Sequence, residues 1–319
     1  MQAIVQDTYG STEVLQSRDI DKPEIGDNEV LVRVHAASVH VGDWIVMTGS
    51  PIVMRFVTGL RKPKNPIPGT DVAGTVEAVG KDVQHLRPGD EVFGWAAGAF
   101  AEYAHADESQ FVKKPADVTF EQASAIGVSA STALQLLRDD GKVRPGQKVL
   151  INGASGGVGT YAVQIAKAFG AEVTGVTSTR NLELVRSIGA DHVIDYTRED
   201  FTTGSERYDL ILDNVGNHSM AKTRRALTPS GTLISNGGGH EDGKLGRTLR
   251  AMLVSMFVKQ QAGPSVKTQN HDDLVALRGL VEAGKVTPVI DRTYPLIDTP
   301  EAIGHVAAGH ARGTVVIAV

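Results

Sequence analysis

A glycine-rich stretch at 152–159 has the composition of a turn that binds phosphate groups. It reads Asn-Gly-Ala-Ser-Gly-Gly-Val-Gly, and Ala154, Gly156 and Gly159 have the spacing of the dinucleotide-binding fingerprint, with alanine in the first place. Glycine permits the tight turn, lets backbone N–H groups approach a pyrophosphate and allows a helix to pack closely on a strand. A strand pattern precedes the stretch and a helical pattern follows it, which favours cofactor binding over a purely structural turn. The expected contacts come from Ser155, Gly156, Gly157 and Val158.

The end of the next strand selects the cofactor. Folds that bind NAD place Asp or Glu about 20 residues after the glycines, where the carboxylate holds the ribose 2′-hydroxyl. Here the chain reads Thr-Ser-Thr-Arg over 177–180 and has no carboxylate. Hydroxyl groups and a guanidinium suit a 2′-phosphate instead, through charge-assisted hydrogen bonds. We therefore predict NADPH, held by Ser178 and Arg180; the alternative for Arg180 is a solvated residue in the first turn of a helix.

Short strands separated by turns make up the first 120 residues. Strand patterns lie at 29–36, 71–80 and 91–94. Gly74, inside the second of these strands, indicates a bulge or the close approach of another backbone. Strands at this spacing predict a small β-barrel or sandwich.

Beyond Pro115, strands and helices alternate. Strand patterns lie at 148–151, 172–176, 192–195, 209–213 and 232–235, and helical patterns lie at 120–139, 158–169, 181–188 and 219–227. Short apolar strands that alternate with helices imply βαβ units around a buried parallel sheet. The chain returns to strand character at 314–318. The expected fold class is therefore α/β.

The composition excludes several classes of protein and site. The chain has 319 residues, of which 41% are apolar, enough for about two domains. Its net charge of −5 argues against a nucleic-acid partner held through phosphate neutralisation. It contains no cysteine, which excludes disulfides, thiolate nucleophiles and zinc sites built on cysteine. No apolar stretch is long enough to span a bilayer and no signal peptide is visible, so we expect a cytoplasmic protein without a membrane span.

Four motifs together carry a resemblance to a known family. They are Asn-Gly-Ala-Ser-Gly-Gly-Val-Gly at 152–159, Ser-Thr-Arg at 178–180, Gly-Ala-Asp-His-Val-Ile-Asp at 189–195 and Asp-Asn-Val-Gly at 213–216. On these motifs the chain resembles the zinc-independent medium-chain dehydrogenase/reductase superfamily. More narrowly, it is similar to NADPH:quinone oxidoreductase-like members, including enoyl and alkenal reductases. The resemblance extends over essentially the whole chain, and its motifs are specific for fold and cofactor rather than for substrate.

The resemblance implies an α/β fold in which a Rossmann doubly wound parallel sheet is inserted into a GroES-like β-barrel catalytic domain. The catalytic domain would comprise residues 1–120 and 287–319, and the NADPH-binding domain would comprise 121–286. The family also implies that cofactor and substrate share the cleft between the domains and that homodimers are common. The expected partners are a small-molecule electrophilic acceptor and a second copy of the chain.

The positions that match the zinc ligands of the family predict a site without a metal. In zinc-dependent relatives a cysteine stands three residues before the aspartate that matches Asp43, and His40 occupies that place here. Their Gly-His-Glu ligand motif is matched by Gly69, Thr70 and Asp71, so the histidine ligand has become threonine. His40 and Asp71 alone do not make a closed zinc site.

A site without a metal favours an acceptor that is already electrophilic. Alcohol oxidation in the zinc-dependent relatives needs a Lewis acid to stabilise the alkoxide. Quinones and α,β-unsaturated carbonyls accept hydride more easily, because conjugation spreads the negative charge onto oxygen. The resemblance therefore implies hydride transfer from NADPH to such an acceptor, aided by alignment and by hydrogen bonds to the developing oxyanion. The alternatives are a zinc-free carbonyl reductase or alcohol dehydrogenase, and an NADPH-binding sensor without turnover.

His40 is the candidate catalytic residue. Quinone reductase-like members usually carry Asn-Pro where this chain has His40 and Val41. An asparagine can only donate through a neutral amide, whereas a histidine can also deliver a proton near neutral pH. Two interpretations stay open: His40 faces the substrate or the nicotinamide, or it is fixed by hydrogen bonds in the wall of the cleft. Asp43 is expected to be a structural partner rather than an acid or base.

Four further positions match family positions near the cofactor. Tyr196 would touch the adenosine phosphate, and Thr132 would lie near the cofactor phosphates or the nicotinamide. The alternatives for these two are a surface tyrosine and a threonine in a helix interior. Val215 and Gly237 lie on turns that would act through their backbone.

A basic stretch lies outside these motifs and contains Arg55, Arg61, Lys62 and Lys64. We interpret it as a solvated loop, and the alternative is a clamp for an anionic substrate.

Overall fold

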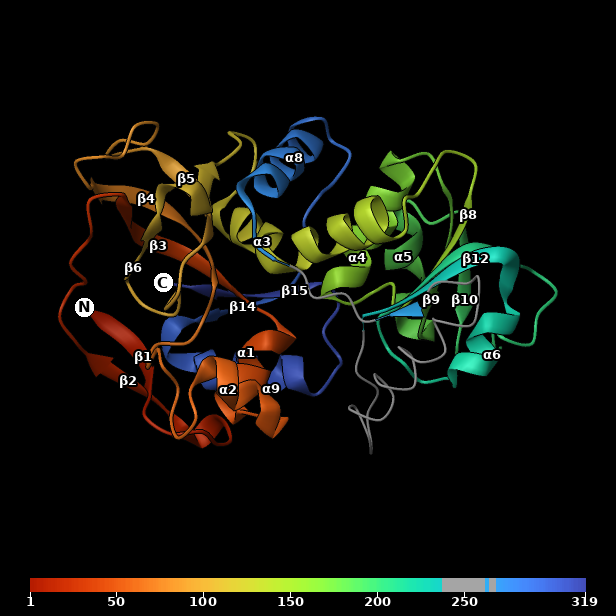
Figure 1. The fold of residues 1–319 in the computed structure, drawn as a ribbon, viewed down its shortest axis with the longest axis horizontal. Helices are drawn as coiled ribbons and strands as arrows, with labels where there is room; N and C mark the ends of the chain where they lie inside the picture. The colour runs from red at the N-terminus through yellow and green to blue at the C-terminus, as the bar shows by residue number, and fades with distance from the viewer. Residues whose placement is uncertain (237–261, 264–267) are drawn as a thin grey trace. The chain divides into compact units, whose positions relative to one another are not determined.

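The structure is a computed structural model that describes residues 1–236, 262–263 and 268–319. The described chain packs into two units (Figure 1). Unit 1 comprises Met1–Ser131, Gln269–Ala283 and Pro288–Val319. Unit 2 comprises the described residues of Thr132–Thr268 and Gly284–Thr287. The domain limits expected from the sequence, at 120 and 287, stay a prediction.

A seven-stranded sheet forms the centre of unit 1. Its strands, in spatial order, are β14 (Ile290–Pro295), β15 (Thr314–Ala318), β3 (Glu29–Val39), β4 (Asp71–Val79), β5 (Glu91–Trp95) and β7 (Phe111–Lys113), with β6 (Tyr103–Asp107) paired to β3. Strands β14 and β15 are parallel, and the other pairs are antiparallel. Strand β15 pairs with β3, with Ile317 opposite Ala37. The predicted C-terminal strand therefore completes the sheet of the N-terminal region.

The long strands β3 and β4 bend together at two register shifts. Gly74 of β4 lies opposite Val34, and a Cβ on Gly74 would stand 2.1 Å from the carbonyl oxygen of Arg33. No side chain fits in that space, so the close backbone approach predicted at Gly74 is confirmed.

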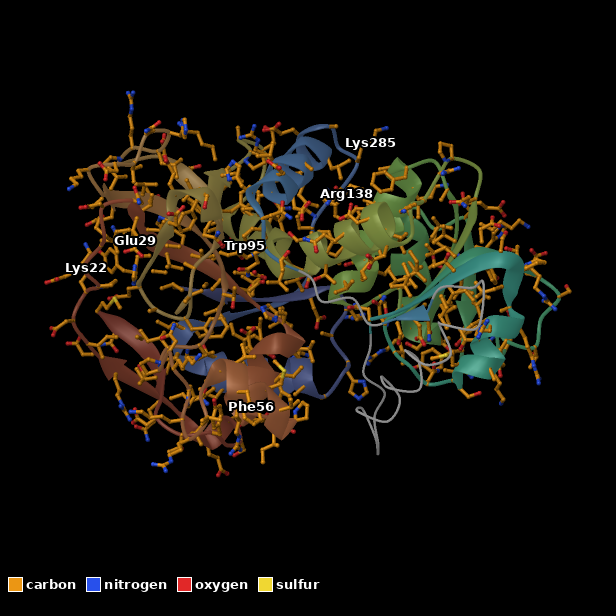
Figure 2. All side chains as sticks on the ribbon, viewed as in Figure 1. Lys22, Glu29, Phe56, Trp95, Arg138 and Lys285 are labelled. Carbon is orange, nitrogen blue, oxygen red and sulfur yellow. The ribbon has the colours of Figure 1, made fainter. Side chains whose placement is uncertain are left out.

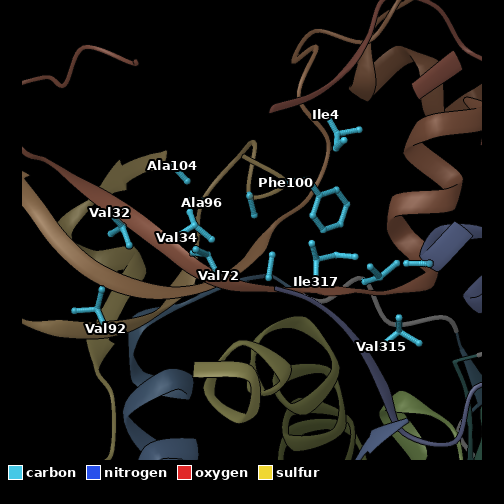
Figure 3. Packing of buried hydrophobic residues seen from close by; sticks show 14 of the residues in the cluster. Ile4, Val32, Val34, Val72, Val92, Ala96, Phe100, Ala104, Val315 and Ile317 are labelled. Atoms are coloured by element: carbon cyan, nitrogen blue, oxygen red, sulfur yellow. The ribbon is translucent and has the colours of Figure 1, made fainter. Parts of the chain in front are cut away.

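Alternating apolar residues of these strands form the core of unit 1 (Figure 3). The core includes Val32, Val34, Val72, Val92, Phe100, Val315 and Ile317. Branched side chains suit the pleated surface of a sheet, which explains why these strands are rich in valine. Strand β3 runs from this core to His40 and then into α1 (Val41–Thr48), so core packing sets the position of His40.

Smaller elements surround the sheet of unit 1. They are β1 (Gln2–Gln6), β2 (Leu15–Asp19), α2 (Arg55–Thr58), α8 (His271–Glu282), α9 (Thr299–Ala307) and the 3₁₀ helices η1 (Thr12–Val14), η2 (Ile52–Met54), η3 (Glu108–Gln110) and η6 (Leu296–Asp298). Strands β1 and β2 pair in antiparallel fashion. Within the described ranges, no helix is both long enough and apolar enough to cross a bilayer.

Unit 2 contains a six-stranded parallel sheet. In spatial order its strands are β10 (His192–Asp195), β9 (Glu172–Thr177), β8 (Lys148–Asn152), β11 (Tyr208–Asp213), β12 (Leu227–Ser235) and β13 (Ala262–Gly263). Its helices include α4 (Gly157–Ala168), η5 (Thr179–Asn181), α5 (Leu182–Ser187) and α6 (Met220–Arg225). Counted along the chain, the strand order is 3-2-1-4-5-6, the doubly wound order in which ligands bind at the carboxyl ends of the strands. The predicted fold class is confirmed.

Helix α3 (Phe120–Gln135) contributes residues to both units. It is kinked at Gly127, where φ is −35° and ψ is −113°. A π-helical turn, Leu136–Asp140, continues it. The kink lies in unit 1, and its cause is a buried carboxylate described below.

Candidate functional site

The glycine-rich turn of unit 2 follows β8 and leads into α4. Gly153 has a φ of +80°, which glycine adopts without strain. A Cβ on Gly159 would stand 2.0 Å from the carbonyl oxygen of Gly153, so this helical position also needs glycine. The backbone thus requires both residues, and together they place the start of α4 at the carboxyl end of β8.

The N-terminus of α4 has the features of an anion site. Gly156 is the N-cap, and no side chain caps the helix. The N–H groups of the first turn therefore have no partner within the helix, and the helix dipole adds positive potential there. In the described part of the chain, a Cβ on Gly156 would meet nothing closer than 3.6 Å. An uncapped helix N-terminus of this kind is suited to bind a phosphate group.

Ser155 is held in place by the end of β9. Its Oγ accepts hydrogen bonds from Thr177 Oγ1 at 2.8 Å and from Asn181 Nδ2 at 3.0 Å. Because both acceptor positions of the oxygen are used, the hydroxyl proton of Ser155 can donate to a phosphate oxygen. Asn181 Nδ2 also donates to Ser178 Oγ at 3.4 Å, so one amide links the predicted contacts Ser155 and Ser178.

A carboxylate that the sequence analysis missed lies beside the end of β9. Asp195 is the last residue of β10, and its register partner on β9 is Thr177. Thr179 Oγ1 donates to Asp195 Oδ2 at 2.5 Å, and this bond lowers the pKa of the Asp195 carboxyl. Arg198 Nε lies 3.5 Å from the same oxygen. In the sequence, Asp195 is visible as an acidic residue that ends the strand predicted at 192–195, but its place beside β9 is not.

We call the carboxyl ends of the strands of unit 2 the carboxyl edge. The charges near β9 and β10 at this edge suit a phosphate better than a hydroxyl group. The Asp195 carboxylate is buried and is engaged by Thr179 and Arg198, whereas the Arg180 side chain is exposed. Arg180 and Arg198 bring two guanidinium groups to this end of the sheet, and guanidinium groups bind phosphate through charge-assisted hydrogen bonds. Tyr196 follows Asp195 and is 56% exposed, so its ring is accessible to a ligand.

The turn after β11 lies next to the glycine turn at the carboxyl edge of the sheet. Asp213 Oδ1 accepts hydrogen bonds from Asn152 Nδ2 at 2.9 Å and from the N–H groups of Val215 and Gly216 at 3.1 and 2.8 Å. A Cβ on Gly153 would stand 2.8 Å from Val215 Cγ2, so the Val215 side chain lies against the glycine turn. Asp213 therefore joins the turn after β11 to the end of β8.

Most of the predicted cofactor contacts meet at this carboxyl edge. These are Ser155, Gly156, Gly157, Val158, Ser178, Arg180, Tyr196 and Val215. Thr132 is half-buried on α3 instead, and Gly237 lies outside the described residues. The edge fits NADPH, because it combines a turn in which Gly153 and Gly159 leave no room for a Cβ, an uncapped helix N-terminus, the free hydroxyl proton of Ser155 and two guanidinium groups. The contact of each residue with the cofactor stays a prediction.

His40 is the N-cap of α1 in unit 1. Its Nδ1 accepts a hydrogen bond from the N–H of Gly42 at 3.0 Å, and its own N–H donates to Asp43 Oδ2 at 2.8 Å. Because Nδ1 accepts, the proton of the neutral ring lies on Nε2. Nε2 is buried and has no hydrogen-bond partner among the described residues. A buried donor without a partner calls for an explanation, such as a bound ligand or an ordered water.

Asp71 of β4 is fully buried and interacts electrostatically with His40. Its Oδ2 accepts from Ser38 Oγ at 2.8 Å, and its Oδ1 accepts from the N–H of Val128 at 2.9 Å. A Cβ on Gly127 would stand 2.2 Å from Oδ1, so glycine at the kink of α3 makes room for the carboxylate. Burial raises the pKa of Asp71 to about 6, against the opposing effects of the His40 charge and the two hydrogen bonds.

Asp43 is the second buried carboxylate beside His40. Burial raises its pKa, and the charge of His40 opposes the rise. Its oxygen binds the backbone of His40 and lies 3.7 Å from Nδ1. Among the residues that the structure describes, no group of three or more His, Cys, Asp or Glu is arranged to hold a metal ion.

Comparisons with known proteins agree with this architecture. The family described as "Zinc-binding dehydrogenase" matches residues 188–317, and the family described as "Alcohol dehydrogenase GroES-like domain" matches 26–116. The mitochondrial NAD(P)H oxidoreductase RTN4IP1 of Bos taurus is 36% identical over 364 residues, which cover 99% of this chain and 89% of the relative. The chloroplastic NADPH-dependent alkenal/one oxidoreductase of Arabidopsis thaliana is 32% identical over 336 residues, covering 99% and 79%. The solved quinone oxidoreductase of Coxiella burnetii is similar with a TM-score of 0.89 and 31% identity, covering 100% of this chain and 99% of that one.

Proposed function

Because this chain belongs to the zinc-independent, quinone oxidoreductase-like branch of the medium-chain dehydrogenase/reductase superfamily, we propose that it transfers hydride from NADPH to a quinone or an α,β-unsaturated carbonyl. The names of the Coxiella and Arabidopsis relatives represent both classes of acceptor. Both are activated by conjugation, so the reaction needs alignment and stabilisation of an oxyanion rather than a Lewis acid.

The carboxyl edge of unit 2 supports NADPH as the cofactor. In this proposal the first N–H groups of α4 and the hydroxyl of Ser155 bind its pyrophosphate, and Ser178 and Arg180 bind its 2′-phosphate; the uncapped helix N-terminus and the free hydroxyl proton of Ser155 support it. When bound, the nicotinamide supplies the hydride. The residues of unit 2 contribute binding and orientation, so changes there should alter cofactor affinity before they alter chemistry.

The buried Nε2–H of His40 is the single observation that carries the catalytic assignment. As hydride adds to the acceptor, negative charge develops on a carbonyl oxygen, and a preorganised N–H donor stabilises that charge. The hydrogen bond from Gly42 holds the ring in the tautomer that offers this donor. A neutral imidazole that gave up its Nε2 proton would become an imidazolate. We therefore assign His40 the role of hydrogen-bond donor and take solvent as the source of the final proton.

The test compares His40→Ala with His40→Asn, using NADPH with one quinone and one enone. Removal of one oxyanion donor typically costs about 10²–10³-fold in rate, so His40→Ala should lose about this much kcat/KM. His40→Asn keeps an amide donor and should retain more activity. The matched control is His105→Ala, because His105 is a partly exposed histidine that pairs with Glu29 at 3.1 Å.

The pH profile separates hydrogen-bond donation from proton delivery. A donor role predicts that the parent and His40→Asn have profiles of the same shape between about pH 5.5 and 8.5, a range that brackets an ordinary histidine pKa near ~6.5. An ionisation that disappears in His40→Asn would instead make His40 the proton donor. Parental kcat/KM in His40→Ala would make the histidine structural. NADPH binding without turnover on quinones, enones and aldehydes would identify a sensor, and turnover on aldehydes alone would identify a carbonyl reductase.

We also propose that the protein is a cytoplasmic homodimer, as the family resemblance and the sequence suggest. The names of two relatives carry an organelle, mitochondrial in one and chloroplastic in the other, so location varies within the family. Light scattering after size-exclusion chromatography tests the dimer, and fractionation of source cells tests the location.

A further inference from the structure

The segment at 51–64 of unit 1 exposes its apolar side. It contains η2 and α2, two consecutive short helices. Five large side chains, between 51% and 73% exposed, form what we call the apolar stripe: Ile52, Val53, Phe56, Val57 and Leu60. Four of them lie in the two short helices, where Ile52 and Phe56, and Val53 and Val57, are four residues apart, and Leu60 follows the end of α2. Figure 2 labels Phe56 on α2. Five large apolar side chains exposed within nine residues point to an interaction site.

Arg55, Thr58 and Gly59 anchor the same segment to the body of unit 1. The Arg55 guanidinium lies 4.6 Å from the centre of the Tyr9 ring, and Arg55 Nε donates to the carbonyl of Gly49 at 3.2 Å. The Tyr9 hydroxyl donates to the carbonyl of Gly59 at 2.6 Å and lies 2.8 Å from Thr58 Oγ1. These contacts hold the segment with its apolar stripe facing outward. The stripe is therefore exposed because Tyr9 and Gly49 bind the opposite side of the segment.

Cations follow the apolar stripe directly. Arg61, Lys62 and Lys64 are exposed. Residues 51–64 contain no acidic residue, although the net charge of the whole chain is −5. Asp7 interacts electrostatically with Lys62 but is itself paired with Arg18 at 2.5 Å. The segment is thus a positive, apolar patch on a negative protein.

We propose that residues 52–64 dock this protein on the surface of an anionic lipid bilayer. The apolar stripe would enter the boundary between headgroups and acyl chains, and the three cations would lie against the lipid phosphates. A second copy of the chain is a poorer occupant, because a two-fold contact would bring identical cations together. A partner helix docks its apolar face into a groove, whereas the stripe consists of side chains that project from the surface. This inference is independent of the reaction proposed above.

Vesicle flotation of the whole protein tests the proposal. The vesicles are pure phosphatidylcholine or phosphatidylcholine with about one third phosphatidylglycerol, in low salt and in about 0.5 M salt, where the Debye length falls below ~5 Å. We expect the parent to float with the anionic vesicles in low salt. Binding should weaken in high salt and be far weaker to the neutral vesicles.

Two sets of variants separate the charged and apolar contributions. Changing all three cations to glutamine (Arg61→Gln, Lys62→Gln, Lys64→Gln) should weaken binding about 100-fold, at about fivefold for each cation. Phe56→Ser with Val57→Ser should weaken it at least tenfold. The matched controls are Ile297→Ser, at an apolar residue 60% exposed on η6, and the exposed pair Lys142→Gln with Lys285→Gln. Neither control should change flotation.

Three results would each overturn the proposal. The first is a parent protein that does not float with anionic vesicles in low salt. The second is flotation that both sets of variants leave unchanged. The third is evidence that something else covers the apolar stripe. A dimer that dissociates in the Phe56→Ser, Val57→Ser variant would identify a second copy of the chain. A raised KM for a water-soluble quinone in that variant, with unchanged flotation, would identify the acceptor. A lost reductase activity with normal flotation would contradict only the proposed function.

Discussion

The buried charge of Asp71 should destabilise unit 1 near neutral pH, and the substitution Asp71→Asn tests this. Asparagine keeps an oxygen for the N–H of Val128 and an amide beside Ser38, so it preserves the contacts at the kink of α3 while it removes the charge. The comparison therefore isolates the free energy of ionising one buried carboxyl group.

The magnitude follows from the pKa of Asp71 in the two states. It is about 6 in the folded protein, against an ordinary value of 3.8. A folded pKa above the unfolded one means that the folded state binds the proton more tightly, so stability is lost as pH rises from about 3.8 to about 6. Linkage gives a loss of ~1 kcal/mol at about pH 4.5 and ~3 kcal/mol at about pH 7.5. Between these pH values, the unfolding free energy of Asp71→Asn should rise by ~2 kcal/mol relative to the parent.

Urea unfolding followed by tryptophan fluorescence measures this shift. The chain has two tryptophans, Trp44 and Trp95, and both belong to unit 1. Trp95 is the register partner of Asp71 on β5, so its emission reports the unfolding of the relevant sheet. The fluorescence transition therefore follows unit 1 rather than the nucleotide-binding sheet.

The exposed residue Asp82 provides the matched control, because Asp82→Asn removes a charge that is not buried. Its difference from the parent should stay within about 0.5 kcal/mol across the same pH interval. A shift for Asp71→Asn that is as small as that of the control, or that has the opposite sign, would refute the argument that burial dominates the titration of Asp71.

Three substitutions and one chelation experiment test the cofactor edge and the expected independence from a metal. Arg180→Ala should raise the Kd of NADPH about tenfold and that of NADH much less, as measured by fluorescence titration; equal losses would contradict the 2′-phosphate assignment. Gly159→Ala should destabilise unit 2, because its Cβ meets the carbonyl of Gly153, whereas Gly156→Ala should fold normally and weaken NADPH binding. Prolonged chelation followed by dialysis should leave the reductase activity unchanged, and a loss restored by zinc would refute this.

The regular elements were predictable because their signals are local. Strands β10 and β15 have the predicted bounds, and β8, β9 and β11 differ from the prediction by a single residue at one end. Each is a short run of apolar, mainly branched residues between turn residues, and its short length and branched side chains favour a buried strand over a helix. The glycine turn was predictable for the same reason, since its motif lies within one strand–turn–helix unit.

The features that sequence analysis missed depend on contacts between distant residues. The kink of α3 at Gly127 exists because Asp71, on another element, needs room for its carboxylate. The place of Asp195 beside Thr179 requires knowing that β10 is the neighbour of β9. The outward apolar stripe depends on Tyr9, which holds the polar side of a segment far along the chain. Local pattern carries none of this information.

The hydrogen bonds of His40 explain why this site is suited to donation rather than to metal binding. A metal ion at Nε2 needs the lone pair of that nitrogen, which moves the ring proton to Nδ1. Nδ1, however, accepts the N–H of Gly42, and two donors would then face each other at 3.0 Å. Glycine is required for this cap, because a Cβ on Gly42 would stand 2.7 Å from the His40 ring. The oxygens of Asp71 accept one hydrogen bond each, from Ser38 and Val128, and so keep lone pairs of their own. What disfavours a metal is therefore the cap at His40, which a metal at Nε2 would break.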